Sequence, residues 1–284
     1  MTSRLLMPVR TAGKTATGTA GNAAAGSTRP TPILDLEHPR VVAFVARVLR
    51  EADERGAVTA RDRLRTAHGI IVPTVRPVYS VEDRRRVSRT LRLGRGSCSQ
   101  RMAVLEAVAR SLGVPTRVRG LLVDGAFWYP RFPKVRPFVP EEVLLAWPEF
   151  LLDGDGDGDG DGDGDGAWVP VAELFAAQGA RTAANGHTTE GFTNHGPETL
   201  FEAVARTPVD WDAPAACAGS TAPCDLSAHL RTDLGRFDSR DELFARHGQT
   251  LCRPARTLAE PVLGRWSAGA APAAPAASAT PSAA

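Results

Sequence analysis

The sequence has little lysine, few aromatic residues and few cysteines. Lysine occurs only at positions 14 and 134, so arginine supplies nearly all of the 34 basic side chains. Four cysteines in 284 residues, without a recognisable signal peptide, do not predict a disulfide framework, and we expect a reduced, cytoplasmic setting. No apolar run approaches the ~18 residues of a membrane-spanning helix, so we expect no membrane partner.

Acidic residues are unevenly distributed along the chain. The first 34 positions have none, whereas residues 153–166 are seven consecutive Asp-Gly pairs. The formal net charge is +2, and it becomes +9 when those seven aspartates are left out. The arginines are scattered, and their densest cluster, residues 84–86, stands beside Glu82 and Asp83. We therefore expect no nucleic-acid partner.

Three stretches have compositions that do not support a packed core. Residues 1–28 are rich in Thr, Ala and Gly, residues 153–166 are the Asp-Gly run, and residues 267–284 are almost only Ala, Pro and Ser. We expect a disordered extension, a disordered loop and a disordered tail. The rest of the chain has the size of one large domain, and a hydrophobic content of 43% is sufficient for a core.

Apolar residues at helical spacing predict several helices. One helix face is evident over residues 41–49, and a second helix is predicted over residues 59–67, with Thr59 as N-cap and Gly69 as its end. The other predicted segments are an extended piece at 70–72, a helix opened by a capping box at 80–83, and C-terminal helical pieces near 198–206, 225–234 and 239–247.

The most informative segment surrounds Cys98. Residues 102–112 carry apolar side chains on one helical face, and Gly113 and Pro115 end that helix. Cys98 therefore stands in the first turn, where free N–H groups and a partial positive charge favour a thiolate. A thiolate there can act as a nucleophile in acyl transfer. The position fits a small buried hydrophobic residue equally well.

Strand patterns follow the Cys helix. Residues 116–123 alternate as a strand does, and residues 143–152 and 167–173 are two β-type runs joined by the Asp-Gly loop, which predicts a hairpin. An insertion rich in aromatic residues and proline separates them at residues 127–140. It can form a wall or lid of a binding cleft, or a packed loop over the sheet edge.

Three features appear in a specific order over residues 59–175. They are a Gly-x-Cys at a helix start, a Leu-Gly-Val-Pro-x-Arg-Val at its end, and two strands that contain Trp147 and Trp168. Together they resemble the transglutaminase-like superfamily. The resemblance implies an α+β, papain-like domain over residues 29–266, in which the Cys helix packs on an antiparallel sheet and a helical elaboration follows. It also implies a Cys nucleophile that acts at amide bonds with a His and an Asp.

The chain departs from that family at two of the three triad positions. Trp147 and Glu149 fit the family's His-x-Trp-x-Glu stretch and stay among the predicted site residues, but Leu145 occupies the His position. Trp168 fits the Trp-x-x-x-Asp stretch, but Ala172 occupies the Asp position. Amide cleavage then lacks the group that protonates the leaving amine.

Other residues are available as substitutes. Glu173 follows Ala172, but a β-bulge would be needed to turn it to the same face. His187 and His195 stand in a polar loop, and His68 precedes an apolar piece. We rank His195 first as a substitute base. The alternative is that all three are ordinary loop or surface histidines.

No metal or cofactor site is predicted. The Asp-Gly run begins like an EF-hand loop, but Gly164 stands where the twelfth position needs Glu. Cys217, Cys224, Cys252 and His229 do not have a recurrent zinc spacing. A Cys217–Cys224 disulfide is an alternative, and buried free thiols are preferred over both.

The sequence leaves two functions open. In the first, the protein is an enzyme, a cysteine-dependent acyl transferase or amide hydrolase: Cys98 attacks a carbonyl carbon, forms a thioester and passes the acyl group to water or an amine. In the second, the domain is non-catalytic and binds a peptide or a protein partner in the former active-site cleft. Neither needs a cofactor. The substrate and the oligomeric state stay open.

Overall fold

The computed structural model describes residues 24–153, 166–175, 191–212 and 225–268. The Asp-Gly loop, His187, Cys217 and Cys224 lie outside the described residues. In the part of the chain that is described, no helix is long and apolar enough to cross a membrane.

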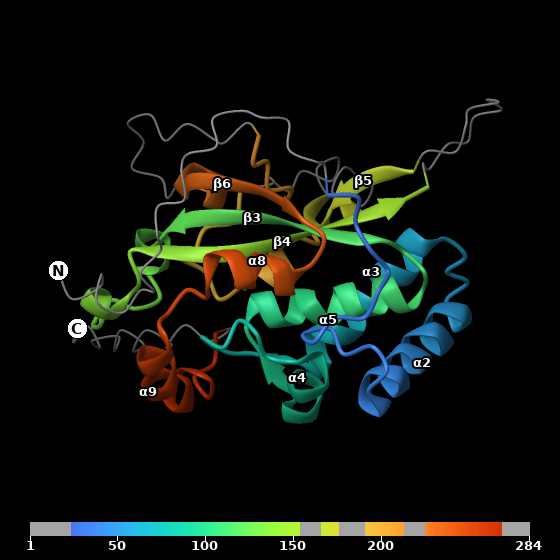
Figure 1. Cartoon of the computed structure of the whole chain (residues 1–284), viewed down its shortest axis with the longest axis horizontal. Coiled ribbons are helices and arrows are strands. Elements are labelled where there is room, and N and C mark those ends of the chain that lie inside the picture. Colours follow the sequence, from blue (N-terminus) through green and yellow to red (C-terminus); the bar gives the residue numbers. More distant parts are fainter. Residues whose placement is uncertain (1–23, 154–165, 176–190, 213–224, 269–284) are drawn as a thin grey trace, which may run out of the picture.

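A four-stranded antiparallel sheet forms the upper layer in Figure 1. Its strands are β3 (Thr116–Asp124), β4 (Glu142–Leu152), β5 (Ala167–Pro170) and β6 (Leu230–Phe237), in the order β5-β4-β3-β6. The central pair runs in continuous register from Thr116 opposite Phe150 to Asp124 opposite Glu142. A separate parallel pair joins β1 (Arg76–Pro77) to β2 (Arg95–Gly96).

Helices cover the lower face of the sheet. α5 (Cys98–Ser111) lies beneath the central strands, and α2 (Pro39–Glu54), α3 (Ala60–Thr74) and α4 (Val87–Leu93) surround it on the side away from the sheet (Figure 1). The remaining helices are α7 (Leu200–Ala203), α8 (Arg240–His247) and α9 (Arg253–Leu263). Short 3-10 turns are η1 (Gly125–Trp128), η2 (Arg136–Phe138), η3 (Val171–Phe175) and η4 (Leu226–His229).

The core surrounds α5 on every side. Leu105 and Val108 have at most 1% of their surface exposed, and polar Glu106 and Arg110 on the same helix are also buried. A helix enclosed all round must have its polar side chains paired. Arg240 of α8 donates to Glu106 at 2.5 Å, and Arg110 donates to the carbonyl of Asp238 at 2.6 Å. These pairs fix α5 against the segment that leads into α8.

The expected α+β fold is confirmed, and so are its main elements. The apolar face over residues 41–49 belongs to α2, and the Cys helix is α5. The helix predicted near residues 239–247 is α8, and Ser239 is its N-cap. The hairpin is also confirmed, because Leu152 of β4 pairs with Ala167 of β5.

The predicted end of the second helix at Gly69 is wrong. α3 begins as expected behind Thr59, whose side chain accepts from the Asp62 N–H, but it continues to Thr74. Ile70 and Ile71, assigned to an extended piece, are helical and at most 2% exposed. Glycine inside a helix costs about 1 kcal/mol, which the burial of two isoleucines outweighs.

The predicted helix over residues 225–234 is also wrong. Only η4 is helical there, and the chain then enters β6, which pairs with β3 from Val118↔Phe237 to Val123↔Leu230. Since β3 would otherwise expose a free edge, pairing overrides the local helical preference. Near residues 198–206, the α-helix is limited to α7.

Two further local predictions need correction. The Ser80–Asp83 stretch does not cap a helix, because α4 begins only at Val87, and the Ser80 hydroxyl is instead bonded to Glu260 of α9. The second strand of the hairpin ends at Pro170, so Ala172 lies in η3 rather than in a strand.

Candidate functional site

Cys98 is the first residue of α5, as predicted. Ser97 is the N-cap: its hydroxyl accepts from the Gln100 N–H at 3.4 Å, while the Gln100 side chain accepts from the Ser97 N–H at 3.0 Å. This is a complete capping box, which fixes the direction of the first turn. Gly96 precedes it, and a side chain there would come within 3.0 Å of Thr90. A larger residue at Gly96 would therefore push the Thr90 or Gln100 side chain aside by a few tenths of an ångström.

A polar network braces this helix start. The amide of Gln100 donates to the Ser80 hydroxyl at 2.8 Å and to the Glu82 carbonyl at 2.7 Å, and it accepts from Arg85 at 2.9 Å. Arg85 also forms an ion pair with Glu260 of α9. The start of α5, the segment before α4 and α9 are thus joined through side chains whose burial makes the bonds strong.

A cavity of about 520 Å³ opens beside the start of α5. Cys98, half-buried, lies in its wall with Phe127 and Trp128 of η1. Leu258 of α9 and Leu200 of α7 contribute to the wall as well. Most other lining side chains are also apolar. The aromatic insertion predicted from the sequence therefore forms part of a cavity wall.

Leu145 of β4 lines the same cavity. The sheet thus brings Leu145 and Cys98, two residues singled out in the sequence, to the wall of one cavity. No histidine lines this cavity in the described part of the chain.

Trp147 and Glu149 do not line the cavity. Trp147 is 1% exposed and packs edge-on against Trp211 at 5.3 Å between ring centroids. Glu149 is also buried and accepts from Arg117 at 2.6 Å and from Arg236 at 3.0 Å. Glu149 therefore neutralises Arg117 of β3 and Arg236 of β6.

The other predicted residues that the structure describes do not line the cavity. His195 is exposed, whereas its neighbour Asn194 lines the wall. His68 is buried against Phe201, whose carbonyl lies 2.6 Å from its Nε2, and burial lowers the pKa of His68. Glu173 in η3 is exposed, and Ala172 is buried.

A buried cation lies near Cys98. The side chain of Arg101 is fully buried, and it donates to Thr199 at 3.2 Å and to the carbonyl of Val72 at 3.2 Å. Burial lowers the pKa of Arg101, whereas the charges of nearby Cys98 and Glu202 raise it. Arg101 is therefore a buried positive group that interacts electrostatically with Cys98, and no sequence motif indicated it.

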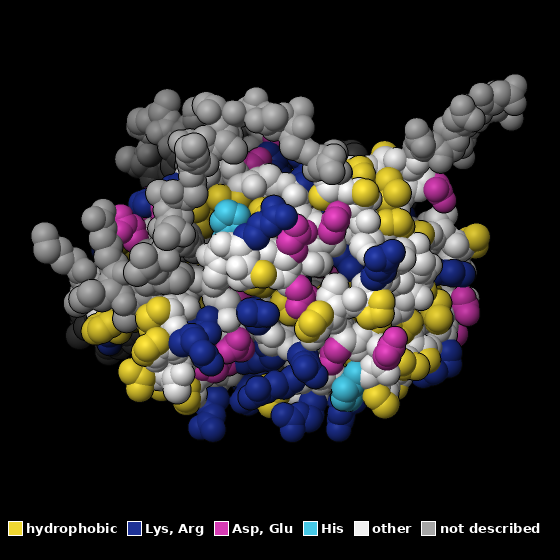
Figure 2. All heavy atoms as spheres, in the orientation of Figure 1, with side chains coloured by type: hydrophobic (Ala, Val, Ile, Leu, Met, Phe, Trp, Pro, Cys, Tyr) yellow, Lys and Arg dark blue, Asp and Glu magenta, His cyan; other side chains and the backbone are white. Residues whose placement is uncertain are grey.

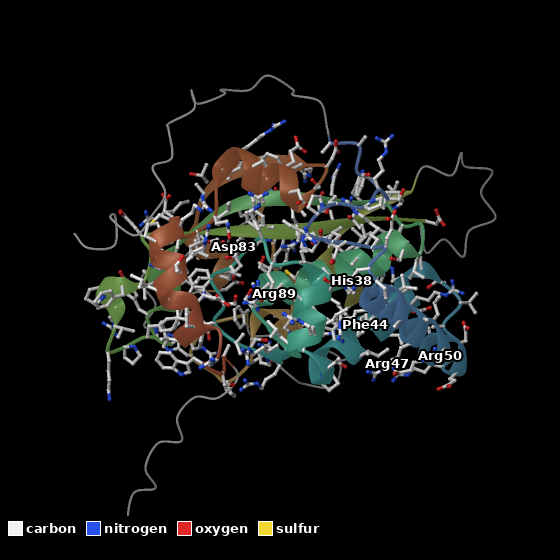
Figure 3. The ribbon with its side chains drawn as sticks, turned by 60° about the horizontal axis from the view of Figure 1, so that its bottom comes forward. His38, Phe44, Arg47, Arg50, Asp83 and Arg89 are labelled. Carbon is white, nitrogen blue, oxygen red and sulfur yellow. The ribbon has the colours of Figure 1, made fainter. Side chains whose placement is uncertain are left out.

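Two titratable groups line the cavity without having been predicted. Burial raises the pKa of Tyr79, and the Arg131 guanidinium opposes that effect. Burial also raises the pKa of Asp83 to about 6, although its carboxylate accepts from the Thr250 N–H at 3.0 Å. Asp83 lies beneath the sheet and beside α9, as Figure 3 shows. Both residues come from an irregular segment, where periodicity gives no signal.

The metal predictions can be tested only in part. Within the described ranges no three His, Cys, Asp or Glu side chains are grouped as metal ligands. Cys252 precedes α9, and His229 packs on Phe127 at 5.2 Å, with burial lowering its pKa.

Comparison with known proteins adds one match. Residues 51–172, which contain Cys98, Leu145 and Ala172, match the family model of the transglutaminase-like superfamily. No curated protein and no solved structure matches the chain.

Proposed function

We propose that this chain, whose residues 51–172 match the family model of the transglutaminase-like superfamily, binds an apolar segment of a peptide or protein without cleaving it. The observation that carries the proposal is the cavity itself. Leu145 and Cys98 share a wall that is mostly apolar and that includes no histidine from the described residues.

The chemistry of the wall argues against amide cleavage. A cysteine hydrolase needs a base to form the thiolate and an acid to protonate the leaving amine, and each such group contributes typically 10²–10⁴-fold. A tyrosine whose pKa is raised by burial, such as Tyr79, is a weak acid at neutral pH. Asp83 already accepts from the Thr250 N–H. Burial raises the pKa of Asp83 to about 6, but we expect its bond to Thr250 to hold the carboxylate on the backbone rather than on the thiol.

The same wall suits binding. Ligand cavities span roughly 300–1,000 Å³ and have mainly apolar and aromatic linings with a few fixed polar groups. The cavity of about 520 Å³ lies within that range, with Phe127, Trp128 and Phe132 as aromatic anchors. Arg131 and Asn194 provide polar groups, which are held by their mutual bond of 3.0 Å. One or two apolar side chains of a peptide fit this environment.

A charge placed in the wall tests the proposal. Leu145→Arg puts a guanidinium among apolar groups and should abolish binding of the uncharged apolar dye Nile red and of apolar peptides that displace it. Val58→Arg is the matched control, because Val58 is 81% exposed and does not line the cavity. Cys98→Ala should bind like the unmodified protein. Equal dye and peptide binding by both arginine variants, with unchanged circular dichroism, would contradict the proposal.

Acyl transfer by Cys98 is the second candidate function. The observation in its favour is a half-exposed thiol at the first position of α5, facing a cavity. It predicts that iodoacetamide labels Cys98 much faster than Cys252 near neutral pH, read by mass spectrometry, and that Cys98→Ala abolishes any turnover. Labelling of Cys98 no faster than the other cysteines would remove this candidate.

A further inference from the structure

Exposed apolar side chains surround the mouth of the cavity. Phe138 of η2 is 65% exposed, and Leu258 of α9 is 80% exposed. Both side chains also line the cavity. Val262 and Trp266 continue the strip beyond them, at 65% and 48%. Figure 2 shows hydrophobic side chains gathered over α9 at the lower left, with basic side chains beside them. We call this strip the rim.

The rim also carries charge of one sign. Lys134 and Arg136 are exposed on one side, and Arg253 and Arg265 are exposed at the two ends of α9. Residues 129–139 contain no acidic residue, and residues 251–268 contain one, Glu260.

That single acid is already neutralised. The Glu260 carboxylate accepts from the Val81 N–H at 2.9 Å and from the Ser80 hydroxyl at 3.0 Å, and it pairs with Arg85. Asp83 lies in the cavity wall, and Glu141 and Glu142, just beyond the first segment, lie 3.8 Å and 3.6 Å from Arg231. The exposed charges of the rim segments themselves are positive, next to an apolar recess.

We propose that the rim selects peptides in which the apolar residues held by the cavity are flanked by Asp or Glu. This inference rests on the proposed function and specifies its ligand. An apolar anchor fills the recess, and the flanking carboxylates meet Lys134 and Arg136 on one side or Arg253 and Arg265 on the other.

A peptide fits this surface better than a bilayer does. Ala255, Ala259 and Leu263 of α9 face the cavity, so this part of the helix is a wall of a recess. Trp266 packs on Phe132 and Tyr79, at 5.9 Å and 6.4 Å between ring centroids, rather than projecting freely. Leu258 and Val262 project, but they stand beside this recess, where they can contact a side chain inserted into it. An interfacial helix would instead bury its whole projecting face in the lipid.

The expected electrostatic effect is moderate and depends on salt. An exposed ion pair changes an equilibrium by roughly 1.5- to 5-fold, so two pairs amount to about tenfold. Raising the ionic strength to 1 M shortens the screening length to about 3 Å and should remove most of the preference.

Three fluorescein-labelled peptides test the inference by anisotropy. All three share one Leu-Phe-Leu core, and their flanks are Asp-Glu, Ser-Gly or Lys-Arg. We expect the acidic peptide to bind about tenfold tighter than the neutral one in low salt, with the basic peptide weakest. Lys134→Glu/Arg136→Glu should remove or reverse this order. The charge-matched control, Arg40→Glu/Arg50→Glu, changes exposed residues of α2, far from α9 in Figures 1 and 3, and should keep it.

Each outcome separates the inference from the function beneath it. If the three peptides bind equally and Leu145→Arg abolishes all binding, the cavity binds apolar groups but the charge selection is refuted. If no peptide binds, the proposed function fails. Binding only to phosphatidylglycerol vesicles, reduced by Arg265→Glu, would overturn the peptide in favour of a membrane. Arg265→Glu also serves as the second rim variant if the double variant does not fold.

Discussion

The buried ion pair between Arg240 and Glu106 should make the domain sensitive to the loss of either partner alone. Arg240 and Glu106 have 1% and 0% of their side chains exposed and approach to 2.5 Å. Arg240 also donates to the Ser99 hydroxyl at 2.9 Å and to the Ala146 carbonyl at 3.2 Å. One guanidinium therefore joins α8, the first turn of α5 and β4.

Removing only the arginine leaves a buried carboxylate without its main partner. Such a change costs about 3–5 kcal/mol, a large share of the 5–15 kcal/mol that stabilises a typical domain. Arg240→Met should therefore lower the free energy of unfolding by about 4 kcal/mol. The double variant Arg240→Met/Glu106→Leu removes the stranded charge as well and should recover most of the loss, because apolar residues of similar volume often replace buried pairs without penalty.

The pH dependence gives an independent sign. Burial raises the pKa of Glu106, and Arg240 and Arg110 oppose that effect. Without Arg240 the pKa of Glu106 should rise further. A carboxyl whose pKa is raised in the folded state stabilises the fold below its unfolded pKa, and that contribution disappears as pH increases. The deficit of Arg240→Met should therefore grow from pH 4 to pH 7.

Urea titrations of Arg240→Met, Glu106→Leu and the double variant, each at pH 4 and pH 7, provide the measurement. The reasoning is refuted if Arg240→Met loses less than about 1 kcal/mol, or if its deficit shrinks as pH rises. Unchanged circular dichroism in dilute buffer is the control that all variants are folded.

Two further predictions concern the cavity wall and the glycines. Burial raises the pKa of Asp83 to about 6, so the stability that its protonated form contributes is lost as pH rises from about 4 through 6. Relative to the unmodified protein, Asp83→Asn should therefore be more stable at pH 7 than at pH 4. The difference in unfolding free energy should be roughly 3 kcal/mol in urea titrations. A slope of opposite sign would show that Asp83 is not desolvated. Gly125→Ala should destabilise the domain by about 1–3 kcal/mol, because the added methyl group would meet the Pro140 carbonyl oxygen. Gly69 of α3 faces open space, so Gly69→Ala should stabilise the domain by up to about 1 kcal/mol. Equal melting temperatures for the two alanine variants would contradict this contrast.

Elements with a strong periodic pattern could be predicted from the sequence. α2 buries Val41, Phe44 and Val48 on one face, and α5 ends at the glycine and proline that were expected to stop it. The strand β6 could not be predicted, because its formation depends on the free edge of β3 and not on its own residues. α9 was also missed.

The site was predictable only where a motif marks it. Cys98 and Leu145, which a sequence motif singled out, line one cavity in the structure. Asp83 and Tyr79 line the cavity from an irregular segment. Arg101 interacts with Cys98 electrostatically from a buried position outside the cavity lining. No short-range pattern encodes such long-range approaches, which depend on how segments far apart in the chain pack together.

The hairpin between β4 and β5 has a consequence for protein engineering. Leu145 lies near one end of β4, and Leu152, where the hairpin connection leaves the strand, is about 24 Å away at the usual rise per residue. The pairing of Leu152 with Ala167 closes the ladder before that connection. Because doubling a connection's length adds only about 0.6 kcal/mol of closure entropy, this position should accept an inserted reporter or epitope sequence. Such a tag would report on the domain without touching the cavity.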